Sequence, residues 1–166
     1  MDDPVPPSRS KEPRLPGNTS VEEKGNAEEG LALPVPSTLS WPLTGQMIRV
    51  SFGSSAAADL SNAPTHPRSV AIFDADRFTM QLLVRRWRPG DVFQPLGMDG
   101  RRKKLQDYFA NIKLPRELRS RIPLIVAPEG ILWVTGLRPD HRFFATTSTK
   151  RTVVAKLLDC VPPKGD

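Results

Sequence analysis

The sequence predicts an α+β fold, mostly antiparallel β in a small sandwich-like or barrel-like sheet, with two short helices and a disordered N-terminal tail. First, short apolar or alternating runs recur between turn residues, as is typical of antiparallel strands. Second, residues 101–112 show a clear helical period. Third, residues 1–33 combine Pro, Gly and clustered Glu without an aromatic residue, a composition that buries too little surface to become ordered.

The length of 166 residues suits one domain with tails. We expect a disordered Pro/Glu-rich tail at residues 1–33, a domain at residues 34–160 and a short tail at residues 161–166. The single cysteine, Cys160, forms no internal disulfide, which fits a reducing compartment. The N-terminus lacks the apolar run of a secretory signal, and no segment approaches the ~20 apolar residues of a membrane span. The expected location is therefore the cytoplasm.

Three strands are predicted in the first half of the domain. QMIRVSF (46–52) alternates between apolar and polar residues, and RSVAIFDAD (68–76) contains a short apolar run typical of a buried strand. Asp74 and Asp76 at its end could be a catalytic pair or metal ligands, but a turn that caps backbone N–H groups fits better. MQLLVRRWR (80–88) changes from apolar to basic on both faces, as expected of a strand that leaves the core and ends at the surface.

Two helices follow. We predict a helix over residues 101–112 because apolar residues recur at i, i+3, i+4 and i+7, with Asp99 or Gly100 as its cap. The predicted buried stripe consists of Leu105, Tyr108, Phe109 and Ile112. A second, short helix is predicted within residues 113–123, where one proline begins it and another stops it.

The remainder of the domain is predicted to be β structure. Residues 123–138 read as a hairpin with the sequence PEG as its turn. Residues 141–159 read as two further strands on either side of TSTK. The mostly antiparallel class rests on these segments, because hairpin connections join antiparallel strands.

Positive charge is concentrated in one region of the chain. Residues 1–40 carry a net charge of −3, and residues 41–166 carry +9. Residues 85–121 alone hold 11 basic and four acidic side chains, a net charge of +7. A concentrated basic patch indicates a polyanionic partner, and nucleic acid first; a solvated basic face without a partner is the alternative.

The basic residues form two clusters, RRWR (85–88) and RRKK (101–104), joined by a Pro/Gly-rich loop. Cations at the start of the predicted helix oppose the helix dipole, which favours anions there. The unpaired N–H groups of a helix start are themselves an anion site, so a bound phosphate would satisfy both. If the loop folds back, both clusters flank one groove.

We therefore predict an RNA-binding set in which cations contact phosphates and glycines let the backbone approach. The set is Arg85, Arg86, Arg88, Gly97, Gly100, Arg101, Arg102, Lys103, Lys104, Lys113, Arg116 and Arg119. Arg121 is less certain because it could face the strands. Tyr108 and Phe109 are expected to be buried, whereas burial and base stacking both remain open for Trp87.

No catalytic residue is predicted. The sequence contains no GxxxxGK[ST], GxGxxG, HExxH or GxSxG pattern. Cys160 has no basic neighbour in a plausible active-site motif. His141 lies beside Asp140, but nothing nearby reads as a nucleophile or an oxyanion site. Neither histidine has metal-ligand spacing, so we predict no metal and no cofactor in this chain.

An ordered set of residue types runs through the basic region and beyond it. The pattern is R-x-R-x-G-D-x-F-x-P-x-G, then K-K-L-x-x-F-x-x-x-K-x-P, then R-x-x-x-P and a hairpin with W-V-x-G. The sequence supplies it with Arg86, Arg88, Gly90, Asp91, Phe93, Pro95, Gly97, Lys103, Lys104, Leu105, Phe109, Lys113, Pro115, Arg119 or Arg121, Pro123, Trp133, Val134 and Gly136. Over roughly residues 34–158, the chain resembles the C-terminal domain of bacterial tRNA(Ile)-lysidine synthetase.

The resemblance implies a tRNA-binding module that grips the tRNA body at or near the acceptor stem. In that family, the enzyme adenylates the wobble cytidine of an isoleucine tRNA with ATP, and lysine then replaces the AMP. ATP and Mg²⁺ are expected only in the N-terminal ATP-pyrophosphatase domain, whose SGGxDS loop this sequence lacks. The chain alone is therefore not expected to be catalytic, and its implied partner is tRNA, with isoleucine tRNA expected.

Two alternatives to a tRNA-binding module remain. The chain could be one half of a split ATP-dependent tRNA(Ile)-lysidine ligase, in which case a separate ATP-binding catalytic chain is its partner. It could also be a remnant or a protein-interaction module without RNA binding. The basic loop and helix favour the tRNA-binding module.

Overall fold

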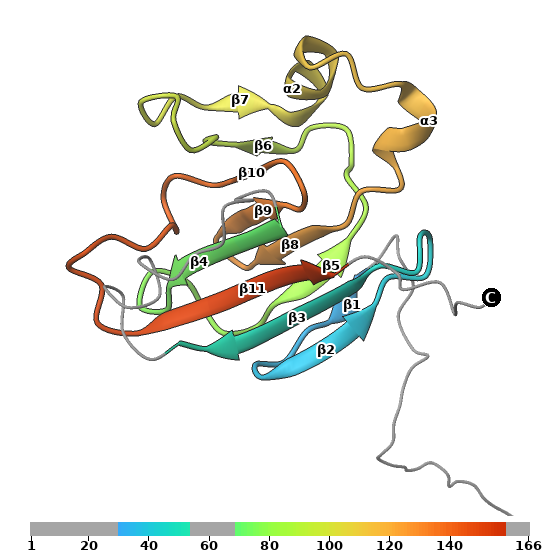
Figure 1. The fold of residues 1–166 in the computed structure, drawn as a ribbon. Helices are drawn as coiled ribbons and strands as arrows, with labels where there is room; N and C mark the ends of the chain where they lie inside the picture. Colours follow the sequence, from blue (N-terminus) through green and yellow to red (C-terminus); the bar gives the residue numbers. More distant parts are fainter. Residues whose placement is uncertain (1–29, 54–68, 159–166) are drawn as a thin grey trace, which may run out of the picture.

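The computed structural model describes residues 30–53 and 69–158. A five-stranded central sheet, in the order β1-β5-β8-β9-β10, lies between a four-stranded outer sheet, β2-β3-β11-β4, and the β6–β7 pair with α2 (Figure 1). All strand pairs are antiparallel, which confirms the predicted fold class. The elements are β1 (Leu31–Ala32), β2 (Ser37–Ser40), β3 (Met47–Phe52), β4 (Val70–Asp74), β5 (Leu83–Arg85), β6 (Val92–Phe93), β7 (Lys103–Lys104), α2 (Leu105–Asn111), α3 (Arg116–Arg119), β8 (Leu124–Ala127), β9 (Gly130–Val134), β10 (Arg138–Pro139) and β11 (Thr152–Leu158).

The central sheet is covered on both faces, because its strand β8 is apolar at every position. Ile125 and Ala127 enter a first core between the central and outer sheets, and the alternating Leu124 and Val126 enter a second core beneath α2. The register between β8 and β9 shifts after Ile125, so that β9 contains one extra residue.

Each core is built around large aromatic residues. The fully buried residues of the first core include Trp41, Ile48, Val50, Phe73, Leu132 and Trp133. The second core is formed by Phe93, Leu105, Tyr108, Phe109, Leu124, Val126, Ile131 and Val134. The indole N–H of Trp41 donates a 2.8 Å hydrogen bond to the carbonyl of Arg121, which ties the loop after β2 to the chain after α3.

The predicted helix over residues 101–112 begins too early. The helix starts at Leu105, because Lys103 and Lys104 are extended and pair with β6. Asp99 and Gly100 are not its cap; both adopt a positive φ in the turn between β6 and β7. Leu105, Tyr108 and Phe109 are buried as predicted, whereas Ile112 is 41% exposed at the C-cap.

Other predicted elements differ in extent. The strands predicted at 46–52 and 68–76 and the hairpin at 123–138 are confirmed. The strand predicted at 80–88 is limited to β5, and the second helix to α3. Of the two strands predicted in residues 141–159, the described residues up to 158 form one, β11, because side-chain hydrogen bonds among residues 146–149 hold a turn before it.

The two-residue strand β1 was not predicted. It pairs with β5 and lies within residues 1–33, for which the sequence predicts disorder. The following residue, Leu33, is buried in the first core. Residues 1–29, 54–68 and 159–166 lie outside the described residues, and with them the prediction for Cys160.

Asp74 and Asp76 have the structural role that the sequence favours. Asp74 accepts hydrogen bonds from the backbone N–H of Asp76, from Arg77 and from the hydroxyl of Thr149. Asp76 pairs with Arg151. Residues 30–53 and 69–158 contain no group of three or more His, Cys, Asp or Glu that could hold a metal ion. The helices described are all too short or too polar to cross a membrane.

Candidate nucleic-acid interface

Asp91 connects the two basic clusters. Its carboxylate accepts hydrogen bonds from Arg85 and from the backbone N–H of Arg88, the latter at 2.7 Å. Its carbonyl accepts a 2.9 Å hydrogen bond from the N–H of Leu105, the first residue of α2. Since β6 pairs with β7, the loop folds back as predicted and brings Lys104 beside the turn that follows RRWR.

The residues of the RRWR cluster are used differently. Arg85 is largely buried and binds Asp91 through both terminal guanidinium nitrogens, so it presents little charge to solvent. Arg86 is half-buried and Arg88 is exposed. Trp87 is half-buried and packs edge-to-face on Phe109, with ring centroids 5.8 Å apart, so its indole belongs mainly to the second core.

The RRKK cluster carries exposed charge. Arg101 and Arg102 are exposed in the loop before β7, and Lys104 is exposed within it. Lys103 is half-buried, because it lies opposite Phe93 and shares the face that turns toward the second core. In the part of the chain that the structure describes, none of these four side chains forms an ion pair.

A second group of cations lies at and after the end of α2. Lys113 and Arg116 are exposed, and Lys113 has the left-handed φ of 60°. Arg119 is half-buried; its Nε donates a 2.9 Å hydrogen bond to the carbonyl of Leu114, and its guanidinium lies 5.9 Å from the centroid of the Phe109 ring. Arg121 is exposed and does not face into the sheet.

The glycine loop between β6 and β7 is tightly shaped. Gly97 and Gly100 have φ values of 90° and 74°, which side chains rarely adopt. A Cβ on Gly97 would also lie 3.0 Å from Nη1 of Arg138. That nitrogen donates a hydrogen bond of 2.6 Å to the carbonyl of Leu96, so the loop and β10 are fixed to each other.

Asp140 also holds the glycine loop in place. Its fully buried carboxylate accepts hydrogen bonds from the N–H of Gln94 at 3.0 Å and from the backbone and guanidinium of Arg142. The N–H of His141 donates a 2.7 Å hydrogen bond to the carbonyl of Gln94. Asp140 is therefore a structural residue whose carboxylate is directed to Gln94 and Arg142, not to the exposed His141.

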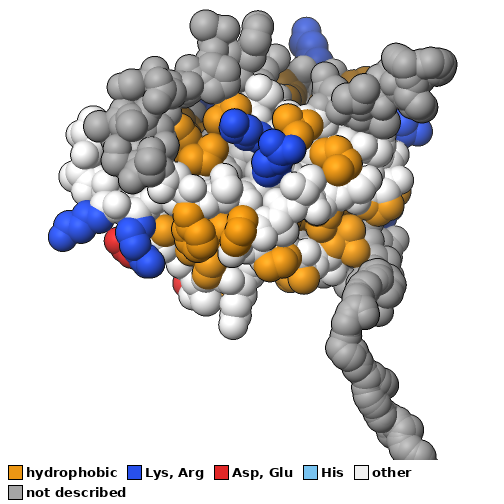
Figure 2. Space-filling view, turned by 60° about the horizontal axis from the view of Figure 1, so that its bottom comes forward, with side chains coloured by type: hydrophobic (Ala, Val, Ile, Leu, Met, Phe, Trp, Pro, Cys, Tyr) orange, Lys and Arg blue, Asp and Glu red, His pale blue; other side chains and the backbone are white. Residues whose placement is uncertain are grey.

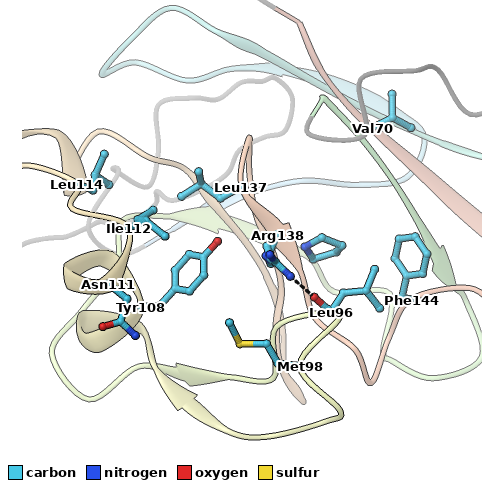
Figure 3. Close-up of a pocket in the computed structure, with 11 residues that line it drawn as sticks. Val70, Leu96, Met98, Tyr108, Asn111, Ile112, Leu114, Leu137, Arg138 and Phe144 are labelled. Carbon is cyan, nitrogen blue, oxygen red and sulfur yellow. Dashed lines mark hydrogen bonds between the residues drawn. The ribbon is translucent and has the colours of Figure 1, made fainter.

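A groove of about 670 Å³ lies between α2, the glycine loop and β10 (Figure 3). Its walls are mainly apolar and include Met98 and Ile112, and its polar lining includes Arg138 and Asn111. Arg138 and Asn111 are not among the binding residues predicted from the sequence. No sequence signal marks them, because the three segments meet only in the folded domain.

The comparisons with known proteins identify this architecture. Residues 82–155 match the family model described as the TilS substrate C-terminal domain. Over these residues, the chain is similar to the TilS C-terminal family. A solved structure described as "Crystal structure of TILS C-terminal domain" superposes on the chain with a TM-score of 0.64 and 28% identity, over 80% of this chain and 98% of that one. The predicted resemblance is therefore confirmed.

Curated TilS relatives extend the match in sequence. The tRNA(Ile)-lysidine synthase of Parabacteroides distasonis is 41% identical over 91 residues, which are 55% of this chain and 20% of that protein. The tRNA(Ile)-lysidine synthase of Geobacter sulfurreducens is 34% identical over 120 residues, 70% of this chain and 24% of that protein. The chain thus spans about a quarter or less of the length of these TilS relatives.

Proposed function

We propose that this TilS-type domain binds folded tRNA through its sugar–phosphate backbone and serves wobble-cytidine modification. The observation that carries the proposal is the exposed charge on the β6–β7 loop, β7 and the α2–α3 connection. Arg101, Arg102, Lys104, Lys113 and Arg116 are exposed and form no ion pair within the described residues. Uncompensated cations on a fixed surface favour a polyanion.

The geometry favours recognition by backbone contacts. A-form RNA is read mainly through its shape and phosphates, because its major groove is too deep and narrow for side chains. Gly97 and Gly100 would let a phosphate approach the loop closely. The names of the relatives make isoleucine tRNA the expected ligand.

The catalytic step of wobble-cytidine modification is assigned to a different domain. In the proposed scheme, adenylation of the cytidine, with its ATP and Mg²⁺, belongs to a catalytic domain with an SGGxDS loop, in the same protein or in a separate chain. The domain described here supplies grip and orientation, because the Asp140 carboxylate binds Gln94 and Arg142 and not His141, and the exposed cations suit phosphate binding. Its residues are therefore binding residues, not catalytic ones.

A titration of the purified chain with fluorescently labelled tRNA, followed by anisotropy across a salt series, tests the proposal. Four or more phosphate contacts give a log–log slope of about −3 or steeper. Tighter binding to tRNA than to single-stranded RNA is also expected. A salt-insensitive affinity for a protein, without affinity for tRNA at low salt, would show instead that the domain is a protein-interaction module.

A further inference from the structure

The groove between α2, the glycine loop and β10 combines apolar walls with few polar groups. Figure 3 shows Arg138 between Tyr108 on α2 and Leu96 on the loop, with Met98 below. Among the described residues, the lining contains no acidic side chain and one cation, Arg138. Volumes of about 300–1,000 Å³ are typical of small-ligand sites, and this groove falls in that range.

The polar groups of the groove retain unused hydrogen-bonding capacity. Arg138 uses Nη1 for the carbonyl of Leu96, and within the described residues its other donors make no hydrogen bond. The amide of Asn111, exposed at the end of α2, likewise has no hydrogen-bond partner in the described chain. An anionic group beside Arg138 and a polar edge beside Asn111 would satisfy them.

Two exposed cations of the basic surface lie close in the chain to residues that line the groove. The N–H of Arg101 donates a 3.1 Å hydrogen bond to the carbonyl of Met98, so this exposed arginine follows one wall directly. On the other side, the exposed Lys113 lies between the lining residues Ile112 and Leu114. Both cations are therefore close in the chain to lining residues, as is the exposed Asp99, which follows Met98.

The groove is also preorganised. The N–H of Leu96 donates a 2.9 Å hydrogen bond to the carbonyl of Pro139, and Asp140 holds Gln94, two residues earlier in the loop. A wall that is already fixed loses little entropy when a ligand binds.

We propose that this groove holds one unpaired nucleotide adjoining an RNA stem, an inference that rests on the proposed tRNA-binding function. The base lies against the apolar wall near Met98, and Asn111 binds its edge. Arg138 takes the adjacent phosphate or stacks on the base, as guanidinium groups do in single-strand recognition. Arg101 and Lys113 take the flanking phosphates.

Three RNA hairpins with an identical stem test the inference with the full chain: blunt, with a 3′ overhang, and with a single bulged nucleotide. The unpaired position carries 2-aminopurine, whose fluorescence reports stacking. We expect at least one unpaired form to bind about tenfold more tightly than the blunt hairpin, the scale of one stacked base. Its 2-aminopurine fluorescence should change on binding.

Variants assign the effect to the groove. Asn111→Ala and Arg138→Gln should each remove most of the preference for the unpaired form over the blunt hairpin. The affinity for the blunt hairpin itself should change by a smaller factor. Gln106→Ala, exposed on the same helix, and Arg49→Gln, exposed on the outer sheet, are the matched controls and should keep the preference. Asn111 is exposed, so its variant is expected to fold even if Arg138→Gln does not.

The outcomes separate the inference from the proposed function. Equal affinity for all three hairpins overturns the inference and leaves tRNA binding intact. Absence of binding to any hairpin or to tRNA overturns both. The inference is also overturned if the preference survives Asn111→Ala and Arg138→Gln, or if the 2-aminopurine signal stays unchanged. Either result shows that the base binds elsewhere or that another ligand, such as an acidic peptide, occupies the groove.

Discussion

Arg85 and Asp91 form a double ion pair that fixes the end of β5 to the start of the β6–β7 hairpin. Nη1 lies 3.0 Å from Oδ2 and Nη2 lies 3.1 Å from Oδ1. The two side chains are only 12% and 13% exposed. The pair therefore positions the basic surface without contributing to its charge.

Replacing Arg85 by Gln should destabilise the domain while leaving RNA contacts in place. We expect the free energy of unfolding to fall by about 2–4 kcal/mol, because Asp91 would remain charged and mostly buried without its guanidinium partner. Urea denaturation measures this loss. The slope of tRNA affinity against salt should stay unchanged under folding conditions; a shallower slope would show that Arg85 itself contacts phosphate.

Replacing Arg101 and Arg102 by Gln should weaken tRNA binding without affecting stability. Each lost phosphate contact reduces the magnitude of the log–log salt slope by about 0.7–0.9, so the double variant should lose about 1.4–1.8. Stability should change by less than about 0.5 kcal/mol, as is usual for exposed sites.

The matched control for this variant lies on the outer sheet. Arg49 and Lys156 are neighbours across β3 and β11, and both are exposed. Figure 2 views the molecule from below, where a few Lys and Arg side chains lie among apolar ones. Changing this pair to Gln removes the same charge. An equal loss of slope in the control would mean that net charge, not the proposed interface, governs binding.

Replacing Asp140 by Asn should disrupt the glycine loop. Asn removes the charge that Arg142 binds and places a donor where the carboxylate now only accepts, so we expect a loss of about 3–4 kcal/mol. Hydrogen exchange at the N–H of Leu96 should accelerate, since the loop would open first. Asp99→Asn, on the exposed tip of the same loop, should be nearly neutral; a comparable loss there would contradict the special role of Asp140.

Thr79 should control the titration of Glu129. Hydrogen bonds from the Thr79 hydroxyl, and from its backbone N–H, hold the pKa of Glu129 below its ordinary value. Because the folded pKa is depressed, the associated stability is present above the unfolded pKa and is lost as the pH falls through the folded pKa. Thr79→Ala should raise the pKa of Glu129, and Thr79→Ser should largely preserve it. NMR titration of the carboxyl carbon measures both, and an unchanged value in Thr79→Ala would refute the assignment.

The sequence predicted those elements whose patterns are long enough to read. The β8–β9 hairpin and β3 carry several apolar residues in register, and the stripe from Leu105 to Phe109 marks the helix. The two-residue strands β1, β6, β7 and β10 carry no periodic signal at all. Lys103 and Lys104 are good helix formers, yet they are extended because pairing with β6 satisfies their backbone groups instead.

The sequence predicted which residues of the candidate site are charged, but not how their side chains are arranged in space. The sequence shows that Arg85 and Arg119 are basic, but only the fold shows that Asp91 and the Leu114 carbonyl bind them. The bond from Gln94 to Asp140 joins residues 46 positions apart, a pairing that no local pattern reveals. The groove could not be predicted from the sequence for the same reason.

The alternation along β8 has a further consequence for how the molecule can be altered. Leu124 and Val126 belong to one core and Ile125 and Ala127 to the other, so this strand is a wall common to both. Opening either core exposes half of the same strand, and we expect both to melt in a single cooperative transition. We therefore expect that the basic hairpin and its helix do not fold as an isolated peptide. A transfer to another protein would have to include both sheets of the sandwich.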